Sequence, residues 1–376
     1  MPSAVPGAST ICALDIESFA LELNEPFGIA GGSPDLARIA LVRLRLADGT
    51  LGLGEAAPLT AYNGETLSGA LRALEAARVL LLGKDARPWR QRALELRAVT
   101  RASASAQCAL ETALVDALAR QCGWSLRDWF GGAGSPQLET DVTIPIMEPA
   151  AAQLAAARWW ARGFRRLKIK VGLGDDLGRV LAAHAGAPEA LLSVDANAAF
   201  AARAACDLVE RLAAQGVQLE LCEQPVAAQD WAGLSQVAQV ARLVLDESVV
   251  SGADAVLAAQ RLGPPHAINI KLMKSGICEA LDIIAVARAS GMSLMIGGML
   301  ESTLAMTTSA CFASGQGGFE FVDLDTPLFL ASSPCVGGFV QHGASLDLSP
   351  IQLGHGVSQS VASLAQSADV EAPRSS

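Results

Sequence analysis

The chain has 376 residues, of which 51% are hydrophobic, so it can bury a large core without disulfide or metal support. Its formal net charge of −10, with no dense cluster of lysine and arginine, excludes a nucleic acid as partner. No segment reaches about 18 uninterrupted apolar residues, which excludes a membrane-spanning helix and leaves no membrane partner.

The eight cysteines and the start of the chain indicate a reducing compartment. The cysteines form no CxxC pair, and most of them lie inside apolar helical or strand patterns, as reduced buried thiols do. The first residues lack a basic flank followed by a long apolar stretch. We therefore expect a cytoplasmic protein.

Residues 1–135 predict an α+β unit. Apolar and polar residues alternate over 19–33 and 37–59, as in antiparallel strands, and the sequence ADGT between two of them is a hairpin signal. Apolar residues at three- and four-residue spacing then predict helices over 64–83 and 105–123.

From Leu138 onward strands alternate with helices, which is typical of a TIM-like barrel of parallel β/α units. Eight strands and seven intervening helices predict a (β/α)8-type barrel at 136–330. Residues 331–360 offer no helix to close the barrel, and we expect them to return to the first unit. Residues 361–376 are small and polar, as in a partly disordered tail. The strands are expected at 140–146, 165–172, 190–197, 218–225, 242–248, 266–273, 292–299 and 319–325.

Five charged residues end successive strands of this predicted barrel: Lys170, Asp195, Glu223, Asp246 and Lys271. The gaps between them are 25, 28, 23 and 25 residues, about the length of one strand plus one helix. Such a barrel gathers all five at one rim, where carboxylates suit a hard divalent cation and lysines suit proton transfer. The pattern therefore indicates an enzyme.

The three acids predict a metal site. One carboxylate from each of three strands is the donor set that Mg²⁺ or Mn²⁺ needs, since these ions prefer hard oxygen ligands. Zinc is disfavoured, because no histidine lies at such a strand end and the cysteines lack ligand spacing. The alternative is that each acid only caps the helix that follows it.

The lysines predict acid/base chemistry. Lys168 and Lys170 alternate with apolar residues, so both side chains point into the barrel. Lys271 lies four strands later, on the opposite side. Two bases that face each other across one carbon can remove a proton on one side and return one on the other, which inverts the centre. The alternative is a set of surface lysines.

The chain resembles the enolase superfamily over nearly its whole length. The motifs LKIK, VDAN, CEQP, LDES, NIKLMKSG and GGMLES carry the resemblance, in this order and with fitting separations. It implies an α+β capping domain, completed by the C-terminal segment, over a barrel whose rim binds Mg²⁺, with Mn²⁺ as a substitute; a lysine base then works beside a stabilised ene-diolate. The implied roles are metal ligands for Asp195, Glu223 and Asp246, an acid/base pair for Lys170 and Lys271, a hold on the substrate carboxylate for Lys168, and support of the seventh strand end for Glu301.

Lysines on both sides of the site, with no histidine late in the barrel, resemble the muconate lactonizing enzyme subgroup. The eighth strand carries Asp323 and Asp325 on one face, similar to the DxD motif with which dipeptide epimerases receive the terminal ammonium group of their substrate. A structural pair of acids bonded to loop amides is the alternative.

Substrate specificity in this subgroup comes from two capping loops, here near 27–34 and 58–64. Gly32 in the first loop, Tyr62 in the second and Gly298 in GGMLES are the candidate contacts. Alanine–glutamate epimerases commonly carry an arginine in the first loop, and no cation stands at that place here. We therefore expect a neutral or apolar second residue in the substrate, although Asp35 could attract a basic one.

The sequence thus predicts a Mg²⁺-dependent epimerase that inverts the α-carbon of the C-terminal residue of a dipeptide, a small-molecule substrate. Other reactions of the subgroup start from a similar enolate and stay open: N-acylamino acid racemisation, o-succinylbenzoate formation and cycloisomerisation. A non-catalytic barrel that binds a small molecule or a partner protein is a second alternative. Relatives often assemble into rings, which leaves a homo-oligomer open as well.

Overall fold

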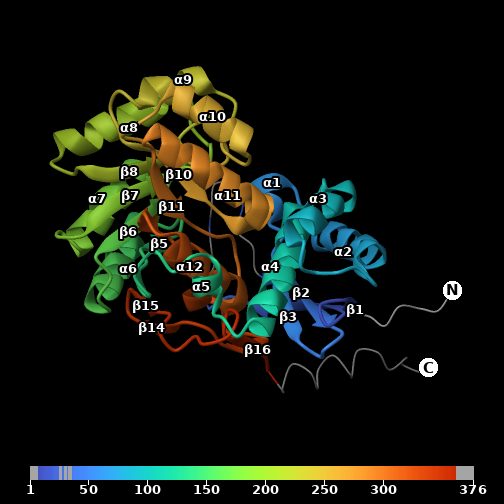
Figure 1. Cartoon of the computed structure of the whole chain (residues 1–376). Helices are drawn as coiled ribbons and strands as arrows, with labels where there is room; N and C mark the ends of the chain where they lie inside the picture. Colours follow the sequence, from blue (N-terminus) through green and yellow to red (C-terminus); the bar gives the residue numbers. More distant parts are fainter. Residues whose placement is uncertain (1–6, 25–27, 29–31, 33–35, 361–376) are drawn as a thin grey trace, which may run out of the picture.

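The computed structural model describes residues 7–24, 28, 32 and 36–360. Figure 1 shows a large ring of strands and helices beside a smaller unit that is built from the first part of the chain. Within the described residues, no helix is long and apolar enough to cross a membrane. The cytoplasmic location and the homo-oligomer stay predictions, and the predicted tail at 361–376 lies outside the described residues.

The smaller unit consists of a three-stranded antiparallel sheet followed by helices. Its strands are β1 (Ile11–Glu22), β2 (Leu36–Leu46) and β3 (Leu51–Ala56), which pair in this order. The predicted hairpin is confirmed, because Leu46 N donates to Thr50 O at 2.9 Å. The helices are α1 (Thr60–Asn63), α2 (Leu67–Leu81), α3 (Trp89–Thr100), α4 (Ala104–Gln121) and α5 (Leu126–Trp129).

Two details of this unit differ from the sequence-based expectation. β1 begins at Ile11 rather than at residue 19, because it pairs with β2 along the whole length of that strand. Most of the predicted first loop near 27–34 lies outside the described residues, which include Gly28 and Gly32 of it. Helix α3 was not expected, because its three arginines interrupt the apolar spacing on which a helix prediction depends.

Helix α4 lies directly on β3, and two glycines make this close approach possible. A Cβ added at Gly54 would lie 1.9 Å from Ala109 O, and one at Gly52 would lie 2.1 Å from Ala113 O. Both distances are far below van der Waals contact, so any side chain there would force the helix away from the sheet. Figure 1 shows α4 between this sheet and the barrel.

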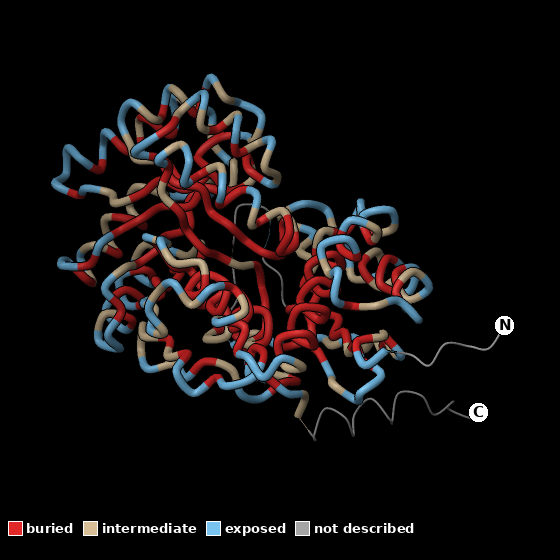
Figure 2. Tube along the Cα trace, viewed as in Figure 1, coloured by how far each residue is buried: buried red, intermediate tan, exposed pale blue. Residues whose placement is uncertain are grey.

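The predicted barrel is confirmed. Its eight strands lie side by side in chain order from β5 to β12, in parallel. Asp141 N donates to Val322 O at 2.9 Å, which joins the first strand to the last. In Figure 2 the middle of the ring is mostly buried, and most exposed positions lie on the surrounding helices and loops. The strands are β5 (Val142–Ile144), β6 (Arg166–Lys170), β7 (Leu191–Asp195), β8 (Leu219–Glu223), β9 (Leu243–Leu245), β10 (Ala267–Ile270), β11 (Ser293–Ile296) and β12 (Phe319–Val322). The intervening helices are α6 (Pro149–Ala161), α7 (Asp176–Gly186), α8 (Ala202–Ala214), α9 (Trp231–Val237), α10 (Gly252–Arg261), α11 (Leu272–Ser290) and α12 (Thr303–Gln316).

The segment after the barrel touches both parts of the molecule. A 3₁₀ helix, η1 (Thr326–Phe329), follows β12, and β15 then pairs with β4 at the start of the barrel. Farther on, Leu126 N donates to Gly354 O at 2.7 Å, and Arg43 donates to the Gln359 side chain at 2.9 Å. These contacts with the smaller unit support the predicted return of 331–360, while the domain boundaries themselves stay predictions. The short strands are β4 (Gln137–Glu139), β13 (Cys335–Gly337), β14 (Val340–His342), β15 (Ser345–Asp347) and β16 (Val357–Gln359).

A buried carboxylate ties this C-terminal segment to the smaller unit. Asp116 of α4 is fully buried and accepts hydrogen bonds from Leu53 N at 3.0 Å, His355 N at 2.9 Å and Arg120 Nε at 2.9 Å. One side chain therefore joins the sheet, the helix and the C-terminal segment. Three donors around one anion offset the cost of burying it.

A second buried carboxylate joins the smaller unit to the barrel. Glu55 at the end of β3 accepts hydrogen bonds from Ser302 N at 2.8 Å and from the Ser302 hydroxyl. Ser302 is the N-cap residue of α12, which follows the seventh barrel strand. Burial raises the pKa of Glu55 to about 7, and the two hydrogen bonds from Ser302 oppose that shift.

Asp116→Ala is expected to lower the free energy of unfolding by roughly 3–5 kcal/mol, because it leaves two buried backbone donors and the half-buried Arg120 without their acceptor. Urea unfolding followed by circular dichroism measures this loss. The matched control is Asp207→Ala, which removes a partly exposed aspartate that also pairs with an arginine four residues away on a helix, and it should cost less than about 1 kcal/mol. Equal losses in the two variants would contradict the role of Asp116.

Glu55→Gln should remove part of the pH dependence of stability. The folded state holds the Glu55 proton more tightly than the unfolded state, so this group stabilises the wild type below about pH 4.5 and stops doing so as pH rises through about 7. The unfolding free energy of Glu55→Gln relative to wild type should therefore rise by roughly 2 kcal/mol between pH 5 and pH 8. Urea titrations at both pH values check this, and a difference that does not change with pH would contradict it.

Candidate functional site

The five charged residues that punctuate the sequence lie together at the carboxyl ends of the barrel strands. Lys170, Asp195 and Glu223 end β6, β7 and β8, and they are register partners across these strands. Asp246 and Lys271 directly follow β9 and β10. All five side chains are buried. The parallel strands thus bring three acids and two lysines to one rim of the barrel.

The two lysines contact different acids on either side of Glu223. Lys170 Nζ lies 2.5 Å from Asp195 Oδ2, and Lys271 Nζ lies 2.6 Å from Asp246 Oδ2. Glu223 stands on the strand between these two pairs. The arrangement therefore has an amine on each flank of a row of carboxylates.

The row of acids fits a hard divalent cation. Glu223 Oε1 accepts a hydrogen bond from Asn269 at 2.6 Å, whereas its buried Oε2 has no hydrogen-bond donor among the described residues. Burial and the neighbouring Asp195 raise the pKa of Glu223. A carboxylate oxygen that accepts no hydrogen bond, with a further acid on each side, suits a Mg²⁺ or Mn²⁺ ion, since these ions prefer oxygen ligands.

Lys168 joins two groups of acids. Its Nζ forms an ion pair with Asp323 and also lies 3.6 Å from Glu223 Oε2 and 4.0 Å from Asp195 Oδ2. Burial lowers the pKa of Lys168, but Asp323 and the other acids raise it by more, so the pKa stands well above its usual range. Lys168 is therefore a fixed positive charge beside the site.

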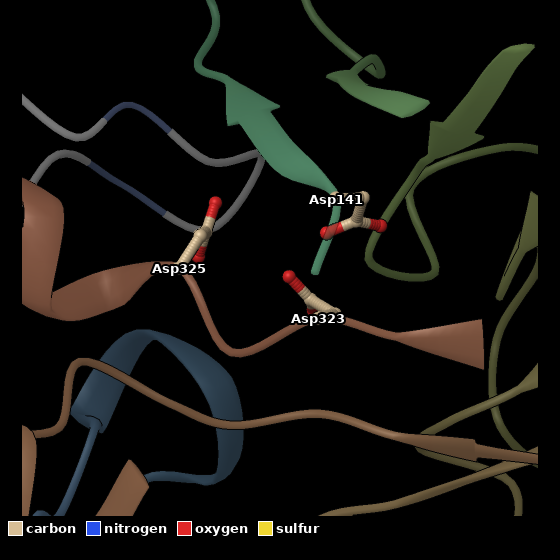
Figure 3. A group of neighbouring side chains, drawn as sticks. All are labelled: Asp141, Asp323 and Asp325. Atoms are coloured by element: carbon tan, nitrogen blue, oxygen red, sulfur yellow. The ribbon is translucent and has the colours of Figure 1, made fainter. Parts of the chain in front are cut away.

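Asp323 and Asp325 were expected on the eighth strand, but β12 ends at Val322 and both acids follow it. They belong to a tighter cluster than the predicted metal ligands do. Within the described residues, Asp141, Asp323 and Asp325 form a group whose carboxylate oxygens all lie within 4.8 Å of one another (Figure 3). Asp325 Oδ2 accepts a hydrogen bond from Thr143 N at 2.6 Å, and Thr143 lies in β5, so this amide belongs to a strand and not to a loop as in the alternative. Burial and the neighbouring Asp323 raise the pKa of Asp325 to about 6.

The remaining predicted residues lie around this rim. The Tyr62 hydroxyl donates to Asp246 Oδ1 at 3.2 Å, and the Tyr62 ring lies 5.3 Å from Lys271 Nζ. Glu301 is buried and accepts a hydrogen bond from Met299 N at 2.6 Å, and burial raises its pKa to about 8. Gly32 is exposed, and no described atom lies within 4 Å of the position that a Cβ would take there. The remainder of its loop, apart from Gly28, lies outside the described residues.

Several of these side chains line a cavity of roughly 510 Å³, a volume that includes its open mouth. Tyr62 and Leu59 come from the smaller unit, whereas Lys168, Lys170 and Lys271 come from the barrel. A second cavity adjoins it, since Leu59 and Leu300 line both. The other residues on the wall of the first cavity are Thr143, Asn197, Gly298, Met299, Leu300, Asp323, Asp325 and Thr326.

Sequence reasoning missed several polar residues of the site. Lys274 Nζ donates to Asp246 Oδ1 and Asp246 O, both at 2.7 Å, and to Asn269 O at 2.8 Å. Gly276, at φ 76°, breaks the helix just after this turn. The motif NIKLMKSG contained the signal, because one helical turn carries Lys274 back beside the strand end. Asn197 of VDAN, which accepts from Lys170 Nζ at 3.1 Å, also lay inside a quoted motif. Asp141 gave no comparable signal.

Comparison with known proteins places the chain in a family. The model of the mandelate racemase / muconate lactonizing enzyme N-terminal domain matches residues 14–131, and the enolase C-terminal domain-like model matches residues 150–362. An aromatic dipeptide epimerase from Herpetosiphon aurantiacus is 46% identical over 354 residues, which cover 93% of this chain and 99% of that protein. A hydrophobic dipeptide epimerase from Citrifermentans bemidjiense is 37% identical over 346 residues, which cover 89% of this chain and 94% of that protein.

Solved structures agree with the sequence comparison. The crystal structure of a dipeptide epimerase from Enterococcus faecalis, complexed with Mg and the dipeptide L-Leu-L-Tyr, has a TM-score of 0.88 to this chain at 31% identity and covers 93% of this chain and all of that one. The chain belongs to the mandelate racemase / muconate lactonizing enzyme family of the enolase superfamily.

Proposed function

We propose that the chain is a Mg²⁺-dependent dipeptide epimerase, which inverts the α-carbon of the C-terminal residue of a dipeptide. The observation that carries the proposal is the pair of buried lysines, Lys170 and Lys271, on opposite flanks of Asp195, Glu223 and Asp246. A carbon held between these amines can lose its proton to one and receive a proton from the other. Relatives at 46% and 37% identity carry the names of dipeptide epimerases, which supports the same activity here.

Asp195, Glu223 and Asp246 are the residues that would hold the cation, and Lys168 would help to hold the substrate carboxylate. When bound, the cation supplies a positive charge for that carboxylate, which stabilises the negative charge that develops as the α-proton leaves. Burial lowers the pKa of Lys271, but Asp246 and Glu223 raise it above its usual range. The charge on these acids therefore controls whether Lys271 can act as a base.

Asp323 and Asp325 are the residues that favour a dipeptide over the other substrates of the family. Both line the cavity, and Asp323 is already in contact with one ammonium group, that of Lys168. A dipeptide carries a free ammonium group at its amino end, whereas an N-acylamino acid and the substrates of the cycloisomerases do not. The carboxylates on the cavity wall therefore favour binding of a dipeptide over binding of these other substrates.

The substrate side chain is proposed to be apolar or aromatic. Leu59, Met299 and Leu300 contribute to the wall of the first cavity. The second cavity is mostly apolar, and Arg38 is the one charged residue among the described residues that line it. The sequence predicted no cation near the first capping loop. Arg38, which follows that loop in the chain, is an exception to this prediction. We expect Ala-Glu dipeptides to be poorer substrates than dipeptides of alanine and an aromatic residue, as the name of the Herpetosiphon relative also suggests.

A dipeptide library incubated with the enzyme and Mg²⁺ in deuterated water tests the proposal. Mass spectrometry should find dipeptides that have gained one deuterium. L-Ala-L-Phe should take up deuterium faster than L-Ala-L-Glu. Lys170→Ala and Lys271→Ala should each slow the interconversion of the two epimers roughly 10²–10⁴-fold, because inversion needs a base on both faces. Each variant should still exchange the α-proton of the one epimer that faces its remaining lysine.

Lys84→Ala is the control for these variants, because Lys84 is an exposed lysine of the smaller unit, and it should leave the rate unchanged. No deuterium in any dipeptide with the wild type would contradict the proposed function. Full inversion by either site variant would contradict the two-lysine mechanism.

The metal ligands can be tested by binding alone. Glu223→Gln should weaken Mn²⁺ binding, measured by electron paramagnetic resonance, by more than roughly tenfold. The matched control is Glu220→Gln on the same strand, since Glu220 pairs with Arg166 away from the site. Chelation of the metal should stop deuterium uptake, and added Mg²⁺ should restore it. Equal Mn²⁺ affinities in the two variants would contradict the assignment of Glu223.

A further inference from the structure

Three carboxyl groups meet where the first and last strands of the barrel join (Figure 3). Asp141 directly precedes β5, while Asp323 and Asp325 follow β12. Their carboxylate oxygens lie within 4.8 Å of one another, and their exposed fractions are 6%, 5% and 1%. Three negative charges at this distance and depth would repel one another strongly.

The positive charge near this cluster is limited. Lys168 forms an ion pair with Asp323, and it also lies within 4.0 Å of Glu223 and Asp195. Lys170 and Lys271 also act on Asp323 from farther away, but they pair with Asp195 and Asp246. The Lys168 ammonium group, which is shared with two further acids, cannot by itself balance three anions. At least one acid of the cluster therefore keeps its proton.

The contacts indicate which acid that is. Asp323 pairs with Lys168, and Asp325 accepts a hydrogen bond from Thr143 N, as anions do. The Asp141 carboxyl group faces Asp323, with oxygens of the two groups within 4.8 Å, and its buried Oδ1 has no hydrogen-bond partner in the described part of the chain. A buried anionic oxygen without a donor is costly, whereas the carbonyl oxygen of a neutral acid is less so. Burial and the charge of Asp323 raise the pKa of Asp141 well above its usual range, although Lys168 opposes this.

We propose that Asp141 is a neutral acid that donates its proton to Asp323 and thereby holds Asp323, as an anion, in place to receive the ammonium group of the substrate. This inference rests on the proposed dipeptide epimerase function. Asp323 and Asp325 are wall residues of the cavity, whereas Asp141 is not among the described residues that line it. Asp141 is thus a positioning residue. The two remaining anions are then balanced by Lys168 and the substrate ammonium group.

The alternative hypothesis is that Asp141 acts as an anion, either as one of three ligands for a metal ion or as a direct partner of the substrate ammonium group. The two hypotheses predict different effects of Asp141→Asn on substrate recognition. Asparagine keeps a hydrogen-bond donor for Asp323 and removes the negative charge. Leucine has a similar size and removes both.

The test uses L-Ala-L-Phe and N-isobutyryl-L-Phe, in which a methyl group replaces the ammonium group. For each enzyme variant, the ratio of kcat/KM for the two compounds, measured by deuterium uptake, reports recognition of the ammonium group. Asp141→Asn should keep this preference within about threefold of wild type, and Asp141→Leu should lower it roughly ten- to one-hundredfold. Because the ratio is taken within one preparation, a smaller folded fraction does not change it. If Asp141→Leu yields no folded protein, Asp141→Ala replaces it.

Asp282→Asn, on the exposed face of α11, is the matched control and should match wild type. A preference lost in Asp141→Asn as fully as in Asp141→Leu would overturn the proposal, as would a preference unchanged in both. Loss of a bound Mn²⁺ ion from Asp141→Asn would overturn it in favour of a metal site.

Infrared spectroscopy tests the neutral acid without any substrate. At pH 8 the wild type should show a C=O band of a protonated carboxyl group that Asp141→Asn lacks, and the absence of such a difference would overturn the proposal. The wild type could show this band and still exchange no α-proton of any dipeptide. That result would contradict the proposed function but would support the neutral state of Asp141.

Discussion

Burial of opposite charges at one rim of the barrel is the constraint on which the rest of the structure depends. Lys170, Lys271 and Lys274 are all buried, and each pairs with a carboxylate at the end of a barrel strand, Lys170 with Asp195 and the other two with Asp246. Each charge is tolerated there only because its partner is in place, and removal of one partner from such a pair costs roughly 3–5 kcal/mol. The strand register that brings Lys170, Asp195 and Glu223 level is therefore fixed by charge as well as by the apolar core.

The smaller unit shares this rim, which explains why it is fastened to the barrel by buried polar contacts. Glu55 bonds to the first turn of α12, and the Tyr62 hydroxyl bonds to Asp246. The cavity wall is therefore made by both parts, with Leu59 and Tyr62 from one and the lysines from the other. Proton transfer is assigned to the rigid strand ends, while the choice of substrate side chain depends on residues from both parts.

The strand ends could be predicted from sequence because their signals are local. Each of Lys170, Asp195, Glu223, Asp246 and Lys271 ends a short apolar run, and a regular spacing is enough to place such residues at one rim of a barrel. Lys274 could have been found by the same reasoning, since a single turn separates it from Lys271.

The long-range contacts could not be predicted in this way. Glu55 meets Ser302 across 247 residues, and Asp141 meets Asp323 only because the barrel closes. Nothing in the neighbouring sequence marks Glu55 or Asp141 as buried. The first capping loop was predicted from likeness to a family, and apart from Gly28 and Gly32 it lies outside the described residues.

A crystal structure with Mg²⁺ and L-Ala-L-Phe bound is the most direct measurement of the central claim. The account predicts that the α-carbon of the phenylalanine lies between the amines of Lys170 and Lys271, one on each face, with the dipeptide ammonium group beside Asp323 and the ion on Asp195, Glu223 and Asp246. Both amines on one face of that carbon, or an ion bound at Asp141, Asp323 and Asp325 instead, would contradict it.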